Sequence, residues 1–432
     1  MPDRDAVDLI RALTEPIGVP GMEDEVRRAV ADLVRPYADD LRVDALGNLM
    51  ATRRGRSPFR LMLDAHMDEV GFVVSYIEEG GFLRLAPLGG WDARIIPSHL
   101  ATVVADDGTR VPGVIGTAPP HILDPDDRKK PYRLEDLFVD IGARSAEDVA
   151  ARGIRIGSPA VIAYPFVELG GRRIAARALD DRAGCAALVA LLMRLARTDE
   201  PPPVTLVLNF AVAEEIGLRG AQTAAYQIEP DLALAVETTV AADVPGLPPA
   251  RQPTRVGGGP ALTVVDRSLV ADPVLVRSLA AVAGEAGIPF QYKLPVFGGT
   301  DAGAIQRSRG GVPAAVVSIP ARYIHAPYSV LDLDDFERTV DLLAAFVQRC
   351  PPPEFAQRAG GSPSRRPGSG PEPRRPRGRR GAGPGRTNKS ERFRRMYDEG
   401  KSVAEIARET GSPYSFVWGV IQRYRRSQDR ET

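Results

Sequence analysis

The hydrophobic positions of this chain fall into short continuous runs that alternate with longer segments of helical periodicity. Short apolar runs are typical of strands that are buried on both faces of a parallel sheet. Such runs occur at Leu61-Met62-Leu63, Val204–Ala213, Leu232–Val236 and Ala314–Ile319. Helical spacing occurs over residues 5–38, with a break at the turn formed by residues 18–21, and over Asp180–Arg197, Pro273–Gly287 and Asp334–Val347. The pattern predicts an α/β fold in which helices flank a sheet.

Between about Val70 and Arg173 the pattern changes to short β-rich segments that are punctuated by Gly and Pro. This texture predicts a small, barrel-like β domain over residues 69–168, inserted into an α/β domain that comprises residues 1–68 and 169–350. The predicted strands of the insertion are Gly71–Ile77, Phe82–Leu85, Ala101–Ala105 and Ala160–Val167.

The chain changes character again after Cys350. Residues 351–387 are rich in Pro, Gly, Ser and Arg, a composition that predicts a disordered basic linker. Helical pattern returns over residues 388–426 and predicts a unit of three helices. Ser402-Val403-Ala404-Glu405 has the spacing of a capping box, and Pro413 is suited to the first turn of the third helix.

A formal net charge of zero hides an uneven distribution. Residues 354–432 hold 19 Lys and Arg against 9 Asp and Glu, which leaves 37 against 47 for residues 1–353. A basic tail on an acidic body indicates a nucleic-acid partner, although a solvated flexible tail explains it equally well.

The last unit resembles the helix-turn-helix of small bacterial regulators. Its small core would comprise Ile406, Ala407, Val417, Val420 and Ile421. The resemblance implies weak, salt-dependent DNA binding, with a three-helix appendage for protein contact as the alternative. The side chains expected to face DNA are Tyr414, Ser415, Trp418 and Arg423.

Cysteine usage and the apolar runs bear on location. Cys185 and Cys350 are the only cysteines, which provides no disulfide framework and suits a reducing compartment. The charged start of the chain lacks the apolar core of a secretory signal, and no apolar run approaches the roughly 20 residues that span a bilayer. We therefore expect a cytoplasmic protein with no membrane partner.

Imidazoles and carboxylates recur at or just after the apolar runs. Two adjacent carboxylates directly after a buried strand are costly unless positive charge lies nearby. Because the carboxyl ends of parallel strands share one edge of a sheet, the series predicts one site with two divalent metal ions. Zinc suits these ligands best, with cobalt or manganese as alternatives. The series is His66, Asp180, Glu214, Glu215, Glu237 and His325.

The same residues carry a resemblance to the dinuclear metallo-aminopeptidases known as glutamyl, deblocking or tetrahedral aminopeptidases, some of which are described as endoglucanase M. The resemblance covers about residues 5–350 and implies a zinc-peptidase-like mixed sheet. It rests on motifs at residues 18–23, 44–49, 64–71, 178–182, 213–217, 299–303 and 324–327.

The resemblance implies a role for each matching position. Asp180 would bridge the two ions, His66 and Glu237 would complete one coordination sphere, and Glu215 and His325 would complete the other. Peptides would be the substrates, and relatives form homo-oligomers from dimers to dodecamers.

Two further roles follow from the resemblance. Glu214 would be the general base that takes a proton from water and returns it to the leaving amine, and Asp68 would orient His66. Glu237 departs from the Asp that many aminopeptidases of this group carry, and resembles related carboxypeptidases and deacylases. A metal-dependent aminopeptidase is thus the leading hypothesis. The alternatives are a deacylase or carboxypeptidase with the same site, or a DNA-binding regulator with a peptidase-like body.

Overall fold

The structure, a computed structural model, describes residues 3–126, 129–198, 200–294, 298–355 and 389–412, together with Val417, Val420, Ile421 and Tyr424. The chain divides into two compact units, Met1–Ser362 and Pro363–Thr432, and each is described by itself. Within the described residues, no helix combines the length and the apolar character needed to cross a membrane.

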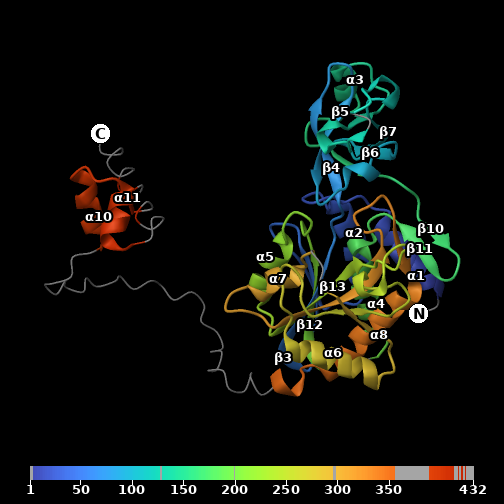
Figure 1. Ribbon diagram of the computed structural model, residues 1–432. Helices are drawn as coiled ribbons and strands as arrows, with labels where there is room; N and C mark the ends of the chain where they lie inside the picture. Colours follow the sequence, from blue (N-terminus) through green and yellow to red (C-terminus); the bar gives the residue numbers. More distant parts are fainter. Residues whose placement is uncertain are drawn as a thin grey trace. The chain divides into compact units, whose positions relative to one another are not determined.

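One mixed sheet forms the framework of the larger unit (Figure 1). Its strand order is β1-β2-β12-β3-β13-β16-β17-β11-β10. Outside this order, β14 pairs with both β16 and β15. The four central strands β12, β3, β13 and β16 run parallel, whereas the flanking pairs are antiparallel. The strands are β1 (Asp40–Val43), β2 (Leu49–Arg53), β3 (Ser57–His66), β10 (Val167–Leu169), β11 (Arg173–Ala176), β12 (Val204–Ala211), β13 (Leu232–Val240), β14 (Ala261–Thr263), β15 (Gln291–Lys293), β16 (Ala314–Arg322) and β17 (Ser329–Asp332).

Helices cover both faces of this sheet, and their packing explains the continuous apolar runs. On one face α4 packs against β3 and β13 and also against α1, α2 and α8, while α5 and α7 pack together on the other face (Figure 1). Strands enclosed in this way must be apolar on both sides. The helices are α1 (Asp3–Thr14), α2 (Asp24–Val34), α4 (Leu179–Leu195), α5 (Arg219–Ile228), α6 (Pro273–Glu285), α7 (Asp301–Gln306) and α8 (Leu333–Arg349), with the short 3-10 turn η5 (Pro249–Arg251).

Small residues let α4 approach the sheet closely. The helix is buried along nearly its whole length. A Cβ at Gly184 would lie 2.4 Å from the carbonyl oxygen of Val236 in β13, so only glycine fits at this crossing. The close approach brings the start of α4 to the carboxyl ends of the central strands.

The inserted segment forms a closed barrel with the strand order β4-β5-β8-β7-β6-β9 (Figure 1). Its core is a separate hydrophobic cluster that includes Phe72, Val103 and Val139. The barrel elements are β4 (Gly71–Ile77), β5 (Leu83–Leu88), η1 (Ala93–Ile95), β6 (Leu100–Val104), β7 (Arg110–Gly116), η2 (Pro120–Ile122), η4 (Leu134–Asp136), β8 (Phe138–Asp140), α3 (Ala146–Ala151) and β9 (Pro159–Ile162).

The predicted fold class is confirmed: a mixed α/β sheet flanked by helices carries an inserted β barrel. One predicted strand is divided. The run over Ala160–Val167 ends as β9 at Ile162, and β10 begins at Val167 in the main sheet. Pro165 lies in between, and proline cannot donate a hydrogen bond to a sheet ladder.

The smaller unit contains the helices α10 (Lys389–Asp398) and α11 (Val403–Thr410). Ser402 and Glu405 form the predicted capping box, and Gly411 ends α11 with φ 62°. Val417, Val420 and Ile421 are helical and pack with Ile406, so the C-terminal helices share a core. The predicted start of the third helix at Pro413 and most of the predicted linker, residues 356–387, lie outside the described residues.

Arg182 is a fully buried cation that joins the N-terminal segment to the end of β3. Its guanidinium donates to the carbonyl oxygens of Leu13, Pro16, Gly18 and Met67 and to the carboxylate of Glu69. A buried guanidinium is stable only when its donors are used, and here the carbonyls of two loops use them.

Arg182→Met should therefore lower the free energy of unfolding by about 3–5 kcal/mol, because several buried carbonyls would lose a donor and Glu69 would lose a cation. Arg194→Met on the same helix is the matched control, since Arg194 forms a half-exposed ion pair with Asp341 and should change stability by at most about 1 kcal/mol. Urea unfolding followed by circular dichroism compares the variants, and equal losses would contradict the assigned role.

Candidate metal centre

The carboxyl ends of the central parallel strands bring distant parts of the sequence together. β3 ends at His66, β12 leads into Glu214 and Glu215, and β13 carries Glu237. Asp180 lies at the start of α4, and His325 follows β16. All six of these residues line one cavity of about 590 Å³.

Asp180 lies between the two imidazoles. The Nε2 atom of His66 is 3.5 Å from Oδ1 of Asp180, and the Nε2 atom of His325 is 3.5 Å from Oδ2. Glu215 Oε1 is 3.4 Å from the same Nε2 atom of His325. The two oxygens of one carboxylate therefore face two different imidazoles, which is the arrangement expected of a bridging ligand.

Two overlapping groups of potential ligand atoms are close enough to hold a metal ion. The first group consists of Asp180, Glu215 and His325, and the second consists of His66, Glu214 and Glu215. Within each group, the potential ligand atoms lie within 4.8 Å of one another. Glu237 belongs to neither group, but it lines the same cavity and its Oε1 accepts a hydrogen bond from the backbone N–H of Asp301 at 2.8 Å.

Asp68 is buried beneath the site and connects three of its residues. Its carboxylate oxygens accept hydrogen bonds from the backbone N–H groups of Glu214 and Glu215, each at 3.0 Å. His66 Nδ1 lies 3.0 Å from the backbone carbonyl oxygen of Asp68 and 3.4 Å from its Oδ1. Asp68 therefore orients the turn that presents both glutamates, in addition to the predicted contact with His66.

Glu23 and Asn48, which belong to motifs of the resemblance, support the segment that leads to Glu214. Asn48 Oδ1 accepts from the backbone N–H of Val212, and Glu23 Oε1 accepts from that of Ala213, both at 3.0 Å. Burial, with the nearby charge of Asp68, raises the pKa of Glu23 to about 7. These side chains hold the segment between β12 and Glu214 in place.

Left-handed backbone recurs around the cavity. Ala178, Ala213 and His325 have φ values of 56°, 54° and 57°. Residues other than glycine rarely adopt this conformation, and it persists only where the surrounding structure imposes it. The two alanines each lie one or two positions before a carboxylate of the site, and His325 is itself a site residue.

The pKa values of the side chains in the cavity indicate whether a cation fits there. Burial raises the pKa of Glu215 to about 7 and that of Glu237 to about 8, and it raises the pKa of Glu214 well above its usual range. Burial opposes protonation of His325, yet Asp180 and Glu215 raise its pKa to about 9. For Asp180, the two imidazoles outweigh burial and lower its pKa.

Buried carboxylates with raised pKa values lack sufficient positive charge, which divalent cations would provide. The available donors are imidazole nitrogens and carboxylate oxygens, the ligand types that bind zinc and similar ions. The residues present therefore fit metal ions.

Three residues at or beside the site were not among those predicted. Asp181 is buried and accepts from the backbone N–H of His66 at 3.3 Å. Asp301 is buried against Glu237 and Asp64. Lys293 is 6% exposed and lines the cavity from the short strand β15. The motifs at residues 178–182 and 299–303 include Asp181 and Asp301, whereas a three-residue strand does not mark Lys293 as functional.

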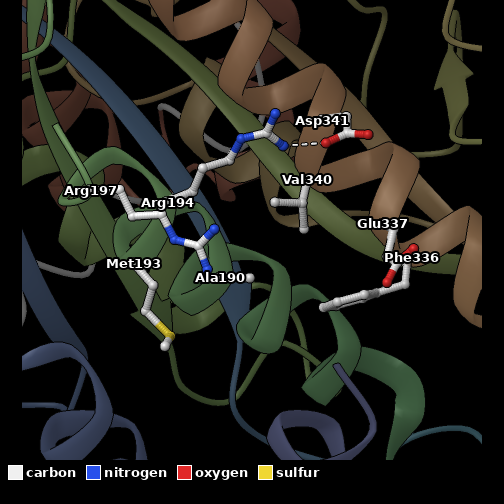
Figure 2. Close-up of a pocket in the computed structure, with 8 residues that line it drawn as sticks. All are labelled: Ala190, Met193, Arg194, Arg197, Phe336, Glu337, Val340 and Asp341. Atoms are coloured by element: carbon white, nitrogen blue, oxygen red, sulfur yellow. Dashed lines mark hydrogen bonds and ion pairs between the residues drawn. The ribbon is translucent and has the colours of Figure 1, made fainter. Parts of the chain in front are cut away.

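A second cavity of about 280 Å³ lies between α4 and α8 (Figure 2). Figure 2 shows Arg194 reaching across it to Asp341. None of the residues expected to hold metal lines it; the lining consists of Ala190, Met193, Arg194, Arg197, Phe336, Glu337, Val340 and Asp341.

The chain thus combines a mixed sheet, an inserted barrel and a cluster of potential metal ligands at the carboxyl edge of the sheet. The sequence model of the M42 glutamyl aminopeptidase family matches residues 47–342, and the chain belongs to this family. The predicted resemblance and the predicted class of enzyme, a hydrolase of peptide bonds, are thereby confirmed.

Named relatives and solved structures agree with this assignment. The lysyl aminopeptidase of Pyrococcus furiosus is 33% identical over 81% of this chain and 98% of its own length. The glutamyl aminopeptidase of Lactococcus lactis is also 33% identical, over 79% of this chain and 95% of its own.

Among solved structures, the aminopeptidase APDkam598 of Desulfurococcus kamchatkensis has a TM-score of 0.79 and 39% identity, covering 83% of this chain and 99% of its own. The TET1 peptidase of Pyrococcus horikoshii, which assembles into a tetrahedron or an octahedral shell, has a TM-score of 0.70 and 32% identity, covering 79% and 99%.

The predicted DNA-facing residues of the tail have no counterpart in these findings. Tyr414, Ser415, Trp418 and Arg423 lie outside the described residues, and the family's sequence model ends at residue 342. The helix-turn-helix assignment and weak DNA binding therefore stay predictions.

Asp68→Asn should weaken metal binding by about 10- to 100-fold, because an amide NH₂ group cannot accept the hydrogen bond that one carboxylate oxygen receives from Glu214 or Glu215. Equilibrium dialysis with zinc measures the change. Asp40→Asn, at an exposed position of β1, is the control and should bind zinc as the wild type does. Unchanged zinc affinity in Asp68→Asn would refute this supporting role.

Proposed function

We propose that the enzyme removes the N-terminal residue of peptides with the help of two divalent ions per subunit, preferably zinc. Asp180 would bridge the ions, with His66 and Glu237 on one side and Glu215 and His325 on the other. The observation that carries the proposal is the position of Asp180, whose two oxygens each face a different histidine Nε2 at 3.5 Å. Bridged ions in such hydrolases are about 3.5–4 Å apart, which one carboxylate can span.

When bound, divalent ions supply Lewis-acid chemistry, which makes water more acidic and stabilises negative charge on the carbonyl oxygen of the scissile bond. The protein's contribution is to place a proton acceptor beside that water. Glu214 lines the cavity with Oε2 4.0 Å from His66 Nε2, and the hydrogen bond from its backbone to Asp68 fixes its position.

Glu214 is suited to move a proton in both directions. Its carboxylate lines the cavity beside His66, where it can exchange a proton with water and with the departing amine. A base of this kind takes the proton from water as the carbonyl carbon is attacked and then donates it to the departing amine. The C–N bond breaks as that nitrogen becomes a neutral leaving group.

Similarity to named aminopeptidases favours substrates with a free amino terminus. The relatives include a lysyl and a glutamyl aminopeptidase. This is the reason to prefer an aminopeptidase over a deacylase or carboxypeptidase that uses the same ligands.

Assembly and location complete the proposal. Because the similar TET1 peptidase assembles into closed shells, we propose a homo-oligomer between a dimer and a dodecamer for this chain. Cys185 and Cys350 are both free and buried, which supports a reducing, cytoplasmic compartment.

Glu214→Gln tests the base directly. The amide keeps the shape of the side chain but cannot accept the proton, so kcat should fall by about 100- to 10,000-fold while zinc content stays near two ions per subunit. Glu200→Gln, at an exposed position, is the control and should retain wild-type turnover. Steady-state kinetics and elemental analysis give both readouts, and unchanged turnover in Glu214→Gln would remove the residue from its proposed role.

The substrate class is tested with a panel of aminoacyl anilides, matched N-acetylated peptides and peptides with blocked carboxyl ends. Hydrolysis should require the free amino group and tolerate the blocked carboxyl end. Faster release of acyl groups from N-acetylated substrates would instead indicate a deacylase, and a requirement for a free carboxyl end would indicate a carboxypeptidase.

A further inference from the structure

The two sides of the proposed metal centre, His66 with Glu237 and Glu215 with His325, differ in the structure that supports them. His66 and Glu237 belong to strands of the main sheet and are 2% and 4% exposed. His325 lies in the loop between β16 and β17, has left-handed backbone, and its side chain is 37% exposed. A ligand in such a loop needs an external contact to fix its ring.

The inserted barrel provides this contact. The loop that follows β5 reaches the metal centre, and the backbone carbonyl oxygen of Gly90 lies 3.0 Å from Nδ1 of His325. Since a carbonyl only accepts, Nδ1 carries a proton, and the lone pair of the neutral ring that binds a metal is then on Nε2, which lies beside Asp180 and Glu215. We propose that the barrel, through Gly90, is a positioning element for the His325 half of the metal centre.

Both glycines of this loop, Gly89 and Gly90, lie close to the side chains of Glu215 and His325. A Cβ on Gly90 would lie 3.2 Å from Nδ1 of His325, and a Cβ on Gly89 would lie 3.2 Å from Oε2 of Glu215. Gly89 also has φ 83°, a backbone conformation that favours glycine. The loop therefore contacts both residues proposed to hold the second ion.

The loop is anchored to the barrel immediately after Gly90. The ring of Trp91 stacks on Phe72 with centroids 5.0 Å apart, and its Nε1–H donates to the carbonyl oxygen of Gly71 at 3.2 Å. Trp91 also shares the lining of a small cavity with Glu215 and His325. The position of the Gly90 carbonyl is thus set by the barrel's own core.

A second contact holds the far side of the His325 loop. Tyr328 stacks on Tyr164, two residues beyond the end of β9, with ring centroids 4.9 Å apart. The Tyr328 hydroxyl also donates a hydrogen bond to the carbonyl oxygen of Pro165 at 3.3 Å. Nδ1 of His99 in the barrel lies 2.6 Å from the Tyr164 hydroxyl and so helps to hold that ring.

The consequence is selective support of one ion. Groups that orient a ligating histidine commonly change metal affinity by about 10- to 100-fold when they are altered. Disturbing the barrel loop should weaken the ion bound by Glu215 and His325 and spare the ion bound by His66 and Glu237. This inference rests on the proposed function, because it assumes that His325 is a ligand.

The test is Gly90→Ala in the full-length protein, with Gly80→Ala as the matched control. Gly80 lies in another loop of the same barrel, where a Cβ would meet only ring carbons of Phe82, at 3.6 Å or more, an ordinary contact. Stepwise zinc titration of metal-free protein, in competition with a chromophoric chelator, measures each equivalent separately. Gly90→Ala should bind one equivalent as the wild type does and the other about 10- to 100-fold more weakly, while Gly80→Ala should match the wild type.

Wild-type affinity for both equivalents in Gly90→Ala would overturn the inference. Equal weakening of both, together with a lower melting temperature, would also overturn it, because that result describes general damage. If Gly90→Ala fails to fold, Tyr164→Leu replaces it: loss of the stacking on Tyr328 should weaken the same single equivalent, and unchanged affinity would again refute the inference.

His325→Ala separates this inference from the proposed function. Two zinc ions bound with wild-type affinity in His325→Ala would refute the assignment of His325 as a ligand. Loss of one equivalent there, combined with an unaffected Gly90→Ala variant, would refute only the role of the barrel.

Discussion

The pairing of one buried carboxylate with two imidazoles on its opposite oxygens is the interaction around which the catalytic unit is arranged. Asp180 can occupy this position only because the start of α4 lies close to the ends of β3 and β13, and Gly184 makes that approach sterically feasible. The neighbouring glutamates add further negative charge in a buried place. Such a concentration of carboxylates is stable when cations neutralise it, so metal binding and the local fold depend on each other.

Several parts of the scaffold serve this arrangement from a distance. Asp68 fixes the turn that presents Glu214 and Glu215, and Asn48 and Glu23 hold the residues just before it. Arg182 attaches the N-terminal segment to the strand that ends in His66. Each contact joins parts of the chain that are far apart in sequence, which is the reason that no single motif describes the site.

The inserted barrel has a closer relation to catalysis than its separate hydrophobic core implies. Its loop at Gly89 and Gly90 lies directly against the centre. The barrel thus contacts a proposed metal ligand while it has a hydrophobic core of its own. The proposed coupling requires only the fixed position of one carbonyl group.

Particular residues show how far prediction from sequence reached. Apolar runs located the central strands because enclosure on both faces requires them to be apolar, and β4 was predicted with its observed bounds, Gly71–Ile77. The ordered carboxylates and histidines likewise indicated one edge of a parallel sheet. Lys293 and Gly90 were not recognisable, since a short strand and a glycine-rich turn are common in any protein.

The sequence by itself thus determined the class of fold and predicted a metal centre together with its residues, because burial periodicity and ligand chemistry are local properties. Only the tertiary structure decided how those residues face one another: that Asp180 lies between two imidazoles, that Asp68 binds the backbone of both glutamates, and that a carbonyl of the barrel lies 3.0 Å from Nδ1 of His325. Hydrogen bonds to backbone groups leave almost no trace in residue identity, and so they become visible only when the chain has folded.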